Sequence, residues 1–109
     1  MAAMKKIIVC YISCIDIEIY SSVDDYIAYV GYPWPDWIDD ENVYEEDGCL
    51  LNFYIRDGSD LCYNRSEIRI EDMKKSMKKY IEVFNLKINS DESTTDMIEG
   101  IIGFRGITA

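Results

Sequence analysis

Residues 49–84 read CLLNFYIRDGSDLCYNRSEIRIEDMKKSMKKYIEVF and combine two different periodicities. Apolar and polar side chains alternate in the first half, which is typical of strands, and Asp57-Gly58 is a strong signal for a hairpin turn. In the second half the apolar residues return every three or four positions, as on one side of a helix: Met73, Met77, Tyr80, Ile81 and Phe84. The stretch therefore predicts an antiparallel hairpin followed by a helix over about 70–84.

The register of this hairpin is predicted from the faces on which its apolar side chains lie. A three-residue loop at 56–58 pairs Phe53 with Leu61 and Leu51 with Tyr63, so the apolar side chains of both strands share one face. A two-residue loop would place Leu61 and Tyr63 on the opposite face. We therefore expect the three-residue loop.

Residues 5–20 predict the central strand of the sheet. Their first half is apolar at almost every position, which is typical of a strand covered on both faces. The alternation continues with Ile15, Ile17 and Ile19. We therefore expect one long strand, with Ser13 at a bulge or a bend.

The remaining elements complete a single α+β domain. Ser21 or Ser22 can cap a short helix that ends before Gly31, and Ser93 can cap a last helix. Residues 86–88 could add an edge strand. The expected domain spans 1–109 and has a mostly antiparallel sheet of roughly 3–4 strands with 2–3 helices, in the order β-α-β-β-α-(β)-α.

The composition indicates a folded chain and excludes several kinds of activity. The 109 residues are 49% hydrophobic and 29% charged, which is typical of a globular domain. There is no histidine, which excludes Ser-His and Cys-His catalysis and histidine-based metal sites. The formal net charge is −10, whereas a nucleic-acid-binding protein needs positive charge. No segment is apolar over the roughly 20 residues of a membrane span.

The negative charge is unevenly placed along the chain. No Lys or Arg occurs between Lys6 and Arg56, although this stretch contains many Asp and Glu residues. A solvated acidic surface would not require half the chain to exclude every cation. Segregated charge produces a field that steers a partner of the opposite sign, so we expect a basic partner.

Residues 31–47, GYPWPDWIDDENVYEED, show no steady period, and 32–47 is the predicted partner-binding segment. Pro33 and Pro35 oppose regular structure at its start, so we expect a long loop with at most a turn of helix at 36–44. Its aromatic side chains can anchor an interface, and its carboxylates can bind Lys and Arg of a partner. The predicted partner-binding residues are Trp34, Asp36, Trp37, Asp39, Asp40, Glu41, Tyr44, Glu45, Glu46 and Asp47. The alternative is a loop that its own tryptophans pin to the core.

The sequence does not indicate a metal site, a cofactor or catalytic residues. The EF-hand pattern is absent from the acidic stretches, and no Cys-x-x-Cys motif occurs. We expect the four cysteines, Cys10, Cys14, Cys49 and Cys62, to be small buried residues in a reducing compartment. The alternating pattern that continues past Cys14 opposes a cleaved leader, so we expect a cytoplasmic protein. Two methionines in the first four residues predict a natural start at Met4, with residues 1–3 added to it.

These features favour a binding protein over an enzyme. The leading hypothesis is a small acidic inhibitor, such as an immunity protein, that neutralises a cognate basic protein, with a bacterial toxin such as a nuclease as the favoured partner. The alternative is a phage-encoded nucleic-acid mimic of the anti-CRISPR or anti-restriction type, in which carboxylates replace phosphates. The third hypothesis is a non-catalytic subunit or scaffold. None of the three requires direct binding to nucleic acid or to a membrane.

Overall fold

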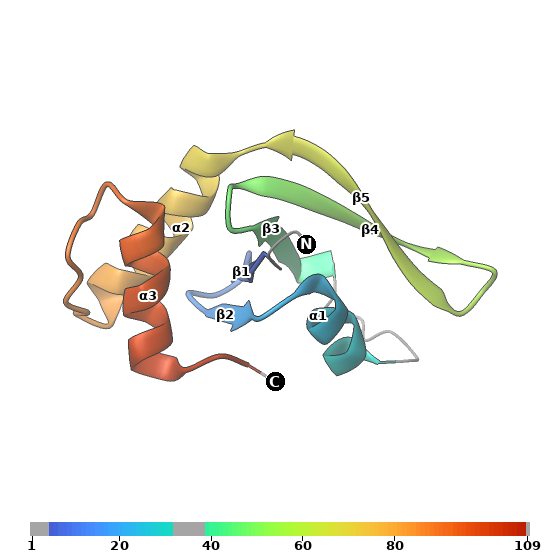
Figure 1. Cartoon of the computed structure of the whole chain (residues 1–109), viewed down its shortest axis with the longest axis horizontal. Helices are drawn as coiled ribbons and strands as arrows, with labels where there is room; N and C mark the ends of the chain where they lie inside the picture. Colours follow the sequence, from blue (N-terminus) through green and yellow to red (C-terminus); the bar gives the residue numbers. More distant parts are fainter. Residues whose placement is uncertain (1–4, 32–38, 109) are drawn as a thin grey trace.

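The computed structural model describes residues 5–31 and 39–108 (Figure 1). This part of the chain contains a five-stranded antiparallel sheet, in the order β2-β1-β3-β4-β5, and three helices. The elements are β1 (Ile7–Tyr11), β2 (Ile17–Tyr20), α1 (Val23–Val30), β3 (Glu41–Glu45), β4 (Cys49–Arg56), β5 (Asp60–Ile68), α2 (Ile70–Val83) and α3 (Thr94–Arg105). The α+β class is confirmed, and the described sheet is larger than the 3–4 strands predicted.

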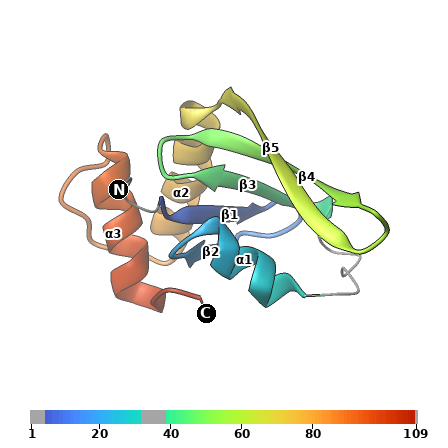
Figure 2. The same cartoon turned by 45° about the vertical axis from the view of Figure 1, so that its right-hand side comes forward.

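The sheet is packed on both faces, with α2 behind it and α1 in front of it in Figure 2. On one face, Ile8 and Tyr44 pack against apolar residues of α2 and α3, including Met77. On the other face, Val9 packs in a second cluster with Tyr26 of α1. Residues 7–10 are buried throughout, so the prediction that the start of the chain forms a strand covered on both faces is confirmed.

The prediction of one long strand over 5–20 is wrong, because the chain reverses between β1 and β2. Ile8 pairs with Ile19 and Cys10 pairs with Ile17, so these four side chains share one face. The reversal is held by a hydrogen bond of 2.8 Å from the Ile12 amide to the Asp40 carbonyl. The bend expected at Ser13 is a full reversal of the chain. The turn contains Ser13 and Asp16 but no Gly, Pro or Asn, and the alternation of apolar residues stays in phase across it, so the local signal is weak.

The segment predicted as a loop over 31–47 contains a central strand, β3. It pairs with β1 along its whole length and with β4 at Val43 and Tyr44. Asp39 and Asp40 lie in a short 3-10 turn just before it. Three of the five residues in β3 are polar or charged, so its pattern does not look like that of a central strand. Glu45 at its end is paired with Arg65, whereas Glu41 at its start accepts a hydrogen bond from Tyr26 and has no cationic partner in the described residues.

The β4–β5 hairpin has a three-residue loop, as predicted, but the loop lies at 57–59. Phe53 therefore pairs with Tyr63, and Ile55 pairs with Leu61. The register is shifted by two residues from the prediction, which leaves the apolar side chains on the same face. Asp57 and Gly58 have φ of 52° and 78°, the left-handed conformation that favours a tight turn.

The predicted helix caps are present. The Ser22 and Ser93 hydroxyls accept hydrogen bonds of 3.2 Å from the Asp25 and Asp96 amides at the starts of α1 and α3. Residues 86–88 form no strand. Within the described ranges, no helix has the length and apolar character needed to cross a bilayer.

The C-terminal end of the fold covers the outer edge of β2. Helix α3 ends at Arg105. Arg105 forms an ion pair of 2.9 Å with Asp16 and donates a hydrogen bond to the Ile17 carbonyl. The Thr108 amide donates a hydrogen bond of 2.7 Å to the Ile19 carbonyl. One of the two edges of the sheet is thus protected within the chain.

Candidate binding site

The structure divides the predicted partner-binding residues into groups with different surroundings. Trp34, Asp36 and Trp37 lie outside the described residues. Tyr44 is only 3% exposed and belongs to the core beneath α2 and α3, so it contributes packing rather than surface. The other six are carboxylates, and they lie toward the two ends of β3: Asp39, Asp40 and Glu41 near its start, and Glu45, Glu46 and Asp47 at its end.

At the end of β3 the carboxylates are engaged by groups of this chain. Glu45 is buried and accepts two hydrogen bonds from the Arg65 guanidinium, at 2.7 and 3.1 Å. Asp47 forms an ion pair of 2.9 Å with Lys5, which holds the pKa of that carboxyl below its usual value. Glu46 accepts a hydrogen bond of 3.2 Å from the Lys6 amide. This end of the strand is therefore largely neutralised.

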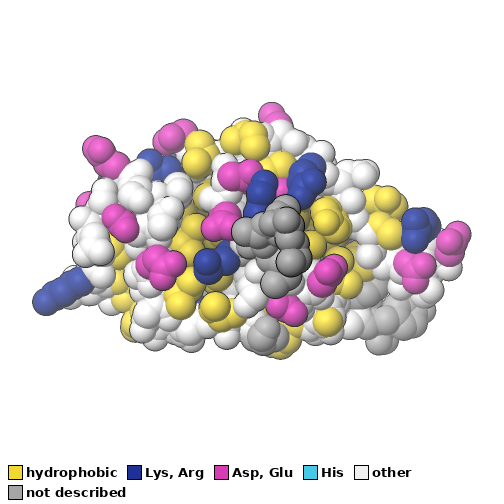
Figure 3. Space-filling view, in the orientation of Figure 1, with side chains coloured by type: hydrophobic (Ala, Val, Ile, Leu, Met, Phe, Trp, Pro, Cys, Tyr) yellow, Lys and Arg dark blue, Asp and Glu magenta, His cyan; other side chains and the backbone are white. Residues whose placement is uncertain are grey.

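The same local neutralisation occurs at the tip of the β4–β5 hairpin. Arg56 lies 3.9 Å from Asp57 and from Asp60. On the face seen in Figure 3, Lys and Arg side chains lie close to Asp and Glu side chains, including at this tip on the right. Charges of both signs are thus mixed on this face, in spite of the large net charge.

At the start of β3 the carboxylates have no such partner. Every Lys and Arg of the chain lies in the part that the structure describes. Within that part, none approaches Asp39, Asp40, Glu41 or Glu18 closely enough to form an ion pair. We call these four residues the open carboxylate cluster. Glu18 comes from β2 and was not among the predicted site residues, although it lies in the same cation-free stretch of sequence.

Glu41 is the most perturbed member of the open carboxylate cluster. Its pKa is raised to about 7, chiefly by burial; a hydrogen bond from Tyr26 opposes the shift, and the neighbouring charges of Glu18 and Asp40 contribute to it. The Tyr26 hydroxyl lies 3.0 Å from one carboxylate oxygen and 3.3 Å from the other. A carboxylate with such a pKa gains strongly from a positive charge placed beside it.

Tyrosine hydroxyls hold Glu18 and Glu41 of the open carboxylate cluster in place, and the Ser13 amide and hydroxyl donate hydrogen bonds to Asp40. Tyr11 donates a hydrogen bond to Glu18, and burial is the main cause that raises the pKa of both Tyr11 and Tyr26. Tyr20 packs edge to face against Tyr26, with 5.2 Å between the ring centroids. The tyrosines therefore stay protonated and act as hydrogen-bond donors, which orients the carboxylates without neutralising them.

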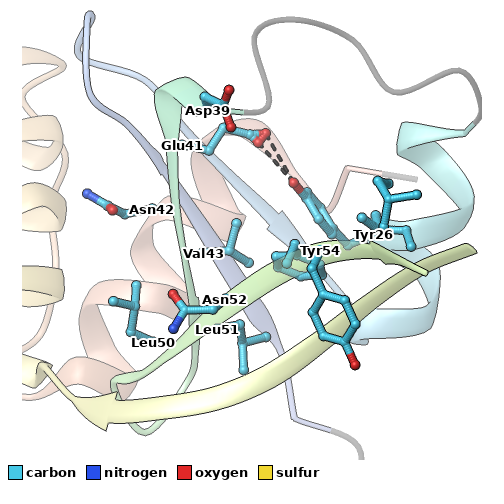
Figure 4. Close-up of a pocket in the computed structure, with 12 residues that line it drawn as sticks. Tyr26, Asp39, Glu41, Asn42, Val43, Leu50, Leu51, Asn52 and Tyr54 are labelled. Carbon is cyan, nitrogen blue, oxygen red and sulfur yellow. Dashed lines mark hydrogen bonds between the residues drawn. The ribbon is translucent and has the colours of Figure 1, made fainter. Parts of the chain in front are cut away.

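Glu41 and Asp39 line a hollow of about 330 Å³ between β3, β4 and α1 (Figure 4). Its lining combines the two carboxylates with aromatic, aliphatic and amide side chains: Tyr26, Asp39, Glu41, Asn42, Val43, Leu50, Leu51, Asn52, Phe53, Tyr54, Ile55 and Leu61. None of these described lining residues is Lys or Arg. Aromatic rings beside carboxylates can hold the ammonium group of Lys or the guanidinium of Arg.

The hairpin residues of the hollow were not predicted as site residues. Phe53 and Tyr54 follow an ordinary strand pattern, and nothing local distinguishes them from core positions. Tyr26 lies on the apolar side of a short helix, where its role as a hydrogen-bond donor to Glu41 depends on the tertiary fold. Only the clustering of acidic residues in the sequence pointed to this region.

The four cysteines form no disulfide bonds. All four are free; Cys10 and Cys49 are buried as expected, but the expectation is wrong for Cys14, which is exposed, and for Cys62, which is half-buried. Burial raises the pKa of the Cys10 thiol to about 12, so that thiol is unreactive. In the two described ranges, no three His, Cys, Asp or Glu side chains are grouped so that they could hold a metal ion.

Comparisons of the chain with protein-family models, with curated proteins and with solved structures found no significant match.

Proposed function

We propose that this protein is a small acidic inhibitor that binds and neutralises a basic protein, with a bacterial toxin such as a nuclease as the favoured partner. The observation that carries the proposal is the open carboxylate cluster beside a hollow whose described lining contains no cation. The cluster gives the partner's Lys or Arg side chains a site in which they meet carboxylates that no cation of this chain already occupies.

The energetics of the open carboxylate cluster support a binding role. The charges of Glu18 and Asp40 help to raise the pKa of Glu41, so these carboxylates repel one another, and this repulsion reduces the stability of the free protein. A cationic side chain of a partner would relieve the repulsion on binding. Elsewhere in the same fold the carboxylates of Glu45 and Asp47 are matched by cations, so the chain has the means to neutralise its own acidic residues.

The acidic charge of this protein is the reason for favouring a nuclease as its partner. Nucleases bind phosphates and therefore carry a cationic surface, which an acidic protein can occupy or cover. A nucleic-acid mimic would need carboxylates that continue in a row, as phosphates do. Along β3 the available negative charge is concentrated at one end, because Arg65 and Lys5 engage Glu45 and Asp47 at the other. This arrangement favours a compact contact over a phosphate-like row.

The cell compartment proposed for this protein is the cytoplasm. Its four thiols are free, and free thiols persist in a reducing compartment. A non-enzymatic role agrees with a site composed of carboxylates, tyrosines and amides, which are suited to hold a cation. The partner would then be inactivated by occupancy of its surface rather than by chemical modification.

The test is affinity capture from an extract of the source organism, followed by mass spectrometry. The bait carries either the wild-type sequence or the double substitution Asp39→Asn with Glu41→Gln. The matched control, Glu46→Gln with Asp47→Asn, removes the same formal charge at the neutralised end of β3. We expect a basic protein that is captured by the wild type and the control and lost with the first variant. Equal capture by all three baits would contradict the proposal.

A further inference from the structure

The inner edge of β4 is only partly used by the sheet. Strand β3 pairs with β4 at two positions, Val43 with Leu51 and Tyr44 with Leu50. On its other side, β4 pairs with β5 as far as Arg56. In the described part of the chain, residues 52–56 therefore have a strand partner on one side only.

The pairing stops because β3 and β4 diverge. If the ladder continued, the next pairs would be Asn42 with Asn52 and Glu41 with Phe53. Glu41 and Asn42 instead pair with β1 on their other side, and all four residues line the hollow. The hollow is thus the space between two strands that have separated.

The lining of the hollow places it along the edge of β4, and Tyr26 and Leu61 show that it also extends over one face of the sheet. Neighbouring side chains of a strand point to opposite faces. Every residue from Leu50 to Ile55 lines the hollow, so it adjoins consecutive residues whose side chains belong to both faces. Only a space beside the strand can do this, and the backbone amides and carbonyls of a strand point to its sides.

An occupant of this space would meet backbone hydrogen-bonding groups and the open carboxylate cluster together. A strand beside 52–56 spans about 17 Å, at about 3.3 Å per residue, which matches an extended segment of five residues. Alternate side chains of that segment would face Glu41 and Tyr26, on the face where Tyr26 packs near Phe53. Because Asp39 and Glu41 supply negative charge there, the favoured side chains are Arg and Lys.

We propose that the partner contributes an extended basic segment that adds to β4 as a strand beside residues 52–56, with an Arg or Lys side chain at Glu41. This inference rests on the proposed function, since it specifies how the basic protein is bound. Strand addition gives affinity through the backbone, and the alternate side chains give specificity. The outer edge of β2, in contrast, is already covered by the Thr108 amide.

The experiment uses a synthetic peptide of alternating Arg and Val residues as the probe. Two further peptides of the same charge carry N-methyl groups on either all the Arg amides or all the Val amides. In a strand these two sets of amides point to opposite sides, so only one set can face β4. Binding of each peptide to the full chain and to Glu41→Gln is measured by NMR titration, with hydrogen exchange of the amides at 52–56.

We expect one methylated peptide to lose about tenfold or more in affinity, because several backbone hydrogen bonds are removed, and the other to bind as well as the parent. The parent peptide should slow hydrogen exchange at alternate amides in 52–56. Equal binding of the two methylated peptides would overturn strand addition. If Glu41→Gln still weakened the binding of all three peptides in that case, the proposed function would stand without strand addition. A parent peptide that fails to bind at millimolar concentration would also overturn strand addition.

Discussion

Tyr26 on α1 and Glu41 at the first position of β3 are joined by a hydrogen bond of 3.0 Å between the tyrosine hydroxyl and a carboxylate oxygen. The bond links α1, on one face of the sheet, to the start of β3, which lies beside the hollow. It orients a carboxylate whose pKa is raised to about 7 chiefly by burial. The stability of the free protein and its affinity for a cation therefore depend on the same side chain.

The first prediction concerns the pH dependence of stability. Because the pKa of Glu41 rises from 4.5 to about 7 on folding, the folded state holds this proton more tightly than the unfolded chain. The resulting stabilisation is complete below about pH 4.5 and is lost as the pH rises through about 7. Glu41→Gln should remove this dependence, since Gln stays neutral and still accepts the hydrogen bond from Tyr26.

The measurement is the free energy of unfolding in urea between pH 4 and 8 for the wild type and for Glu41→Gln. The difference between the two isolates Glu41 from other groups that titrate. We expect the variant to gain stability relative to the wild type as the pH rises, with the change centred between pH 4.5 and 7. A difference that does not vary with pH would show that Glu41 has an ordinary pKa.

The second prediction concerns the rate of association with the captured partner. Electrostatic steering weakens with ionic strength, so the rate should fall steeply between low and high salt. At low salt, Asp39→Asn should slow association by roughly two- to fivefold, a part of the 10- to 1000-fold that steering can supply. Asp47→Asn, which removes a carboxylate already paired with Lys5, should have a smaller effect. Stopped-flow or surface-binding kinetics would check both, and a rate independent of salt would exclude steering.

The elements with strong local signals could be predicted from the sequence. The stripe from Met73 to Ile81 indicated α2, and Ser22 and Ser93 indicated the helix starts. Asp57-Gly58 likewise indicated the hairpin turn between β4 and β5. In each case the residue types that fix the backbone are adjacent or one helical turn apart.

The elements that were missed depend on contacts between distant parts of the chain. The reversal between β1 and β2 is held by Asp40, and the carboxylate of Glu45 in β3 is satisfied by Arg65. Nothing in the sequence near the β1–β2 turn or β3 identifies Asp40 or Arg65 as the partner. The division of the acidic segment into a neutralised and an open end follows from the same long-range pairs, so composition could locate the segment but not its binding end.

The third prediction concerns the lysines on the outer side of α2. Replacing Lys74, Lys75, Lys78 and Lys79 by Gln should leave partner binding intact. Removing four positive charges from −10 gives −14, so association with a basic partner should become faster at low salt. The exposed bond of 2.8 Å from Lys74 Nζ to the Glu92 carbonyl is lost, at a cost below about 1 kcal/mol. Loss of the complex with unchanged circular dichroism would place the binding surface on α2.

The fourth prediction compares two glycines of α3. A Cβ atom at Gly103 meets nothing within 4 Å, so Gly103→Ala should raise stability by roughly 0.5–1 kcal/mol through helix propensity. A Cβ atom at Gly100 would clash with Ile88 Cγ2, so Gly100→Ala should destabilise by roughly 1–3 kcal/mol. Thermal or urea unfolding would check both. A stabilised Gly100→Ala would contradict the packing of α3 against residues 86–88.

The last prediction separates an interface anchor from a core residue. Trp37 remains a predicted contact, and its truncation to Ala should speed dissociation by a factor corresponding to about 2–4 kcal/mol, as for aromatic hot spots. Tyr44, 3% exposed, is the matched aromatic control. Tyr44→Ala should lower the free energy of unfolding by about 3 kcal/mol and leave the affinity of the folded fraction unchanged. Both quantities are measured for both variants. If Trp37→Ala instead behaved as Tyr44→Ala, with a large loss of stability and unchanged affinity, Trp37 would be a packing residue, and the anchor would have to be sought among the aromatic residues of the hollow.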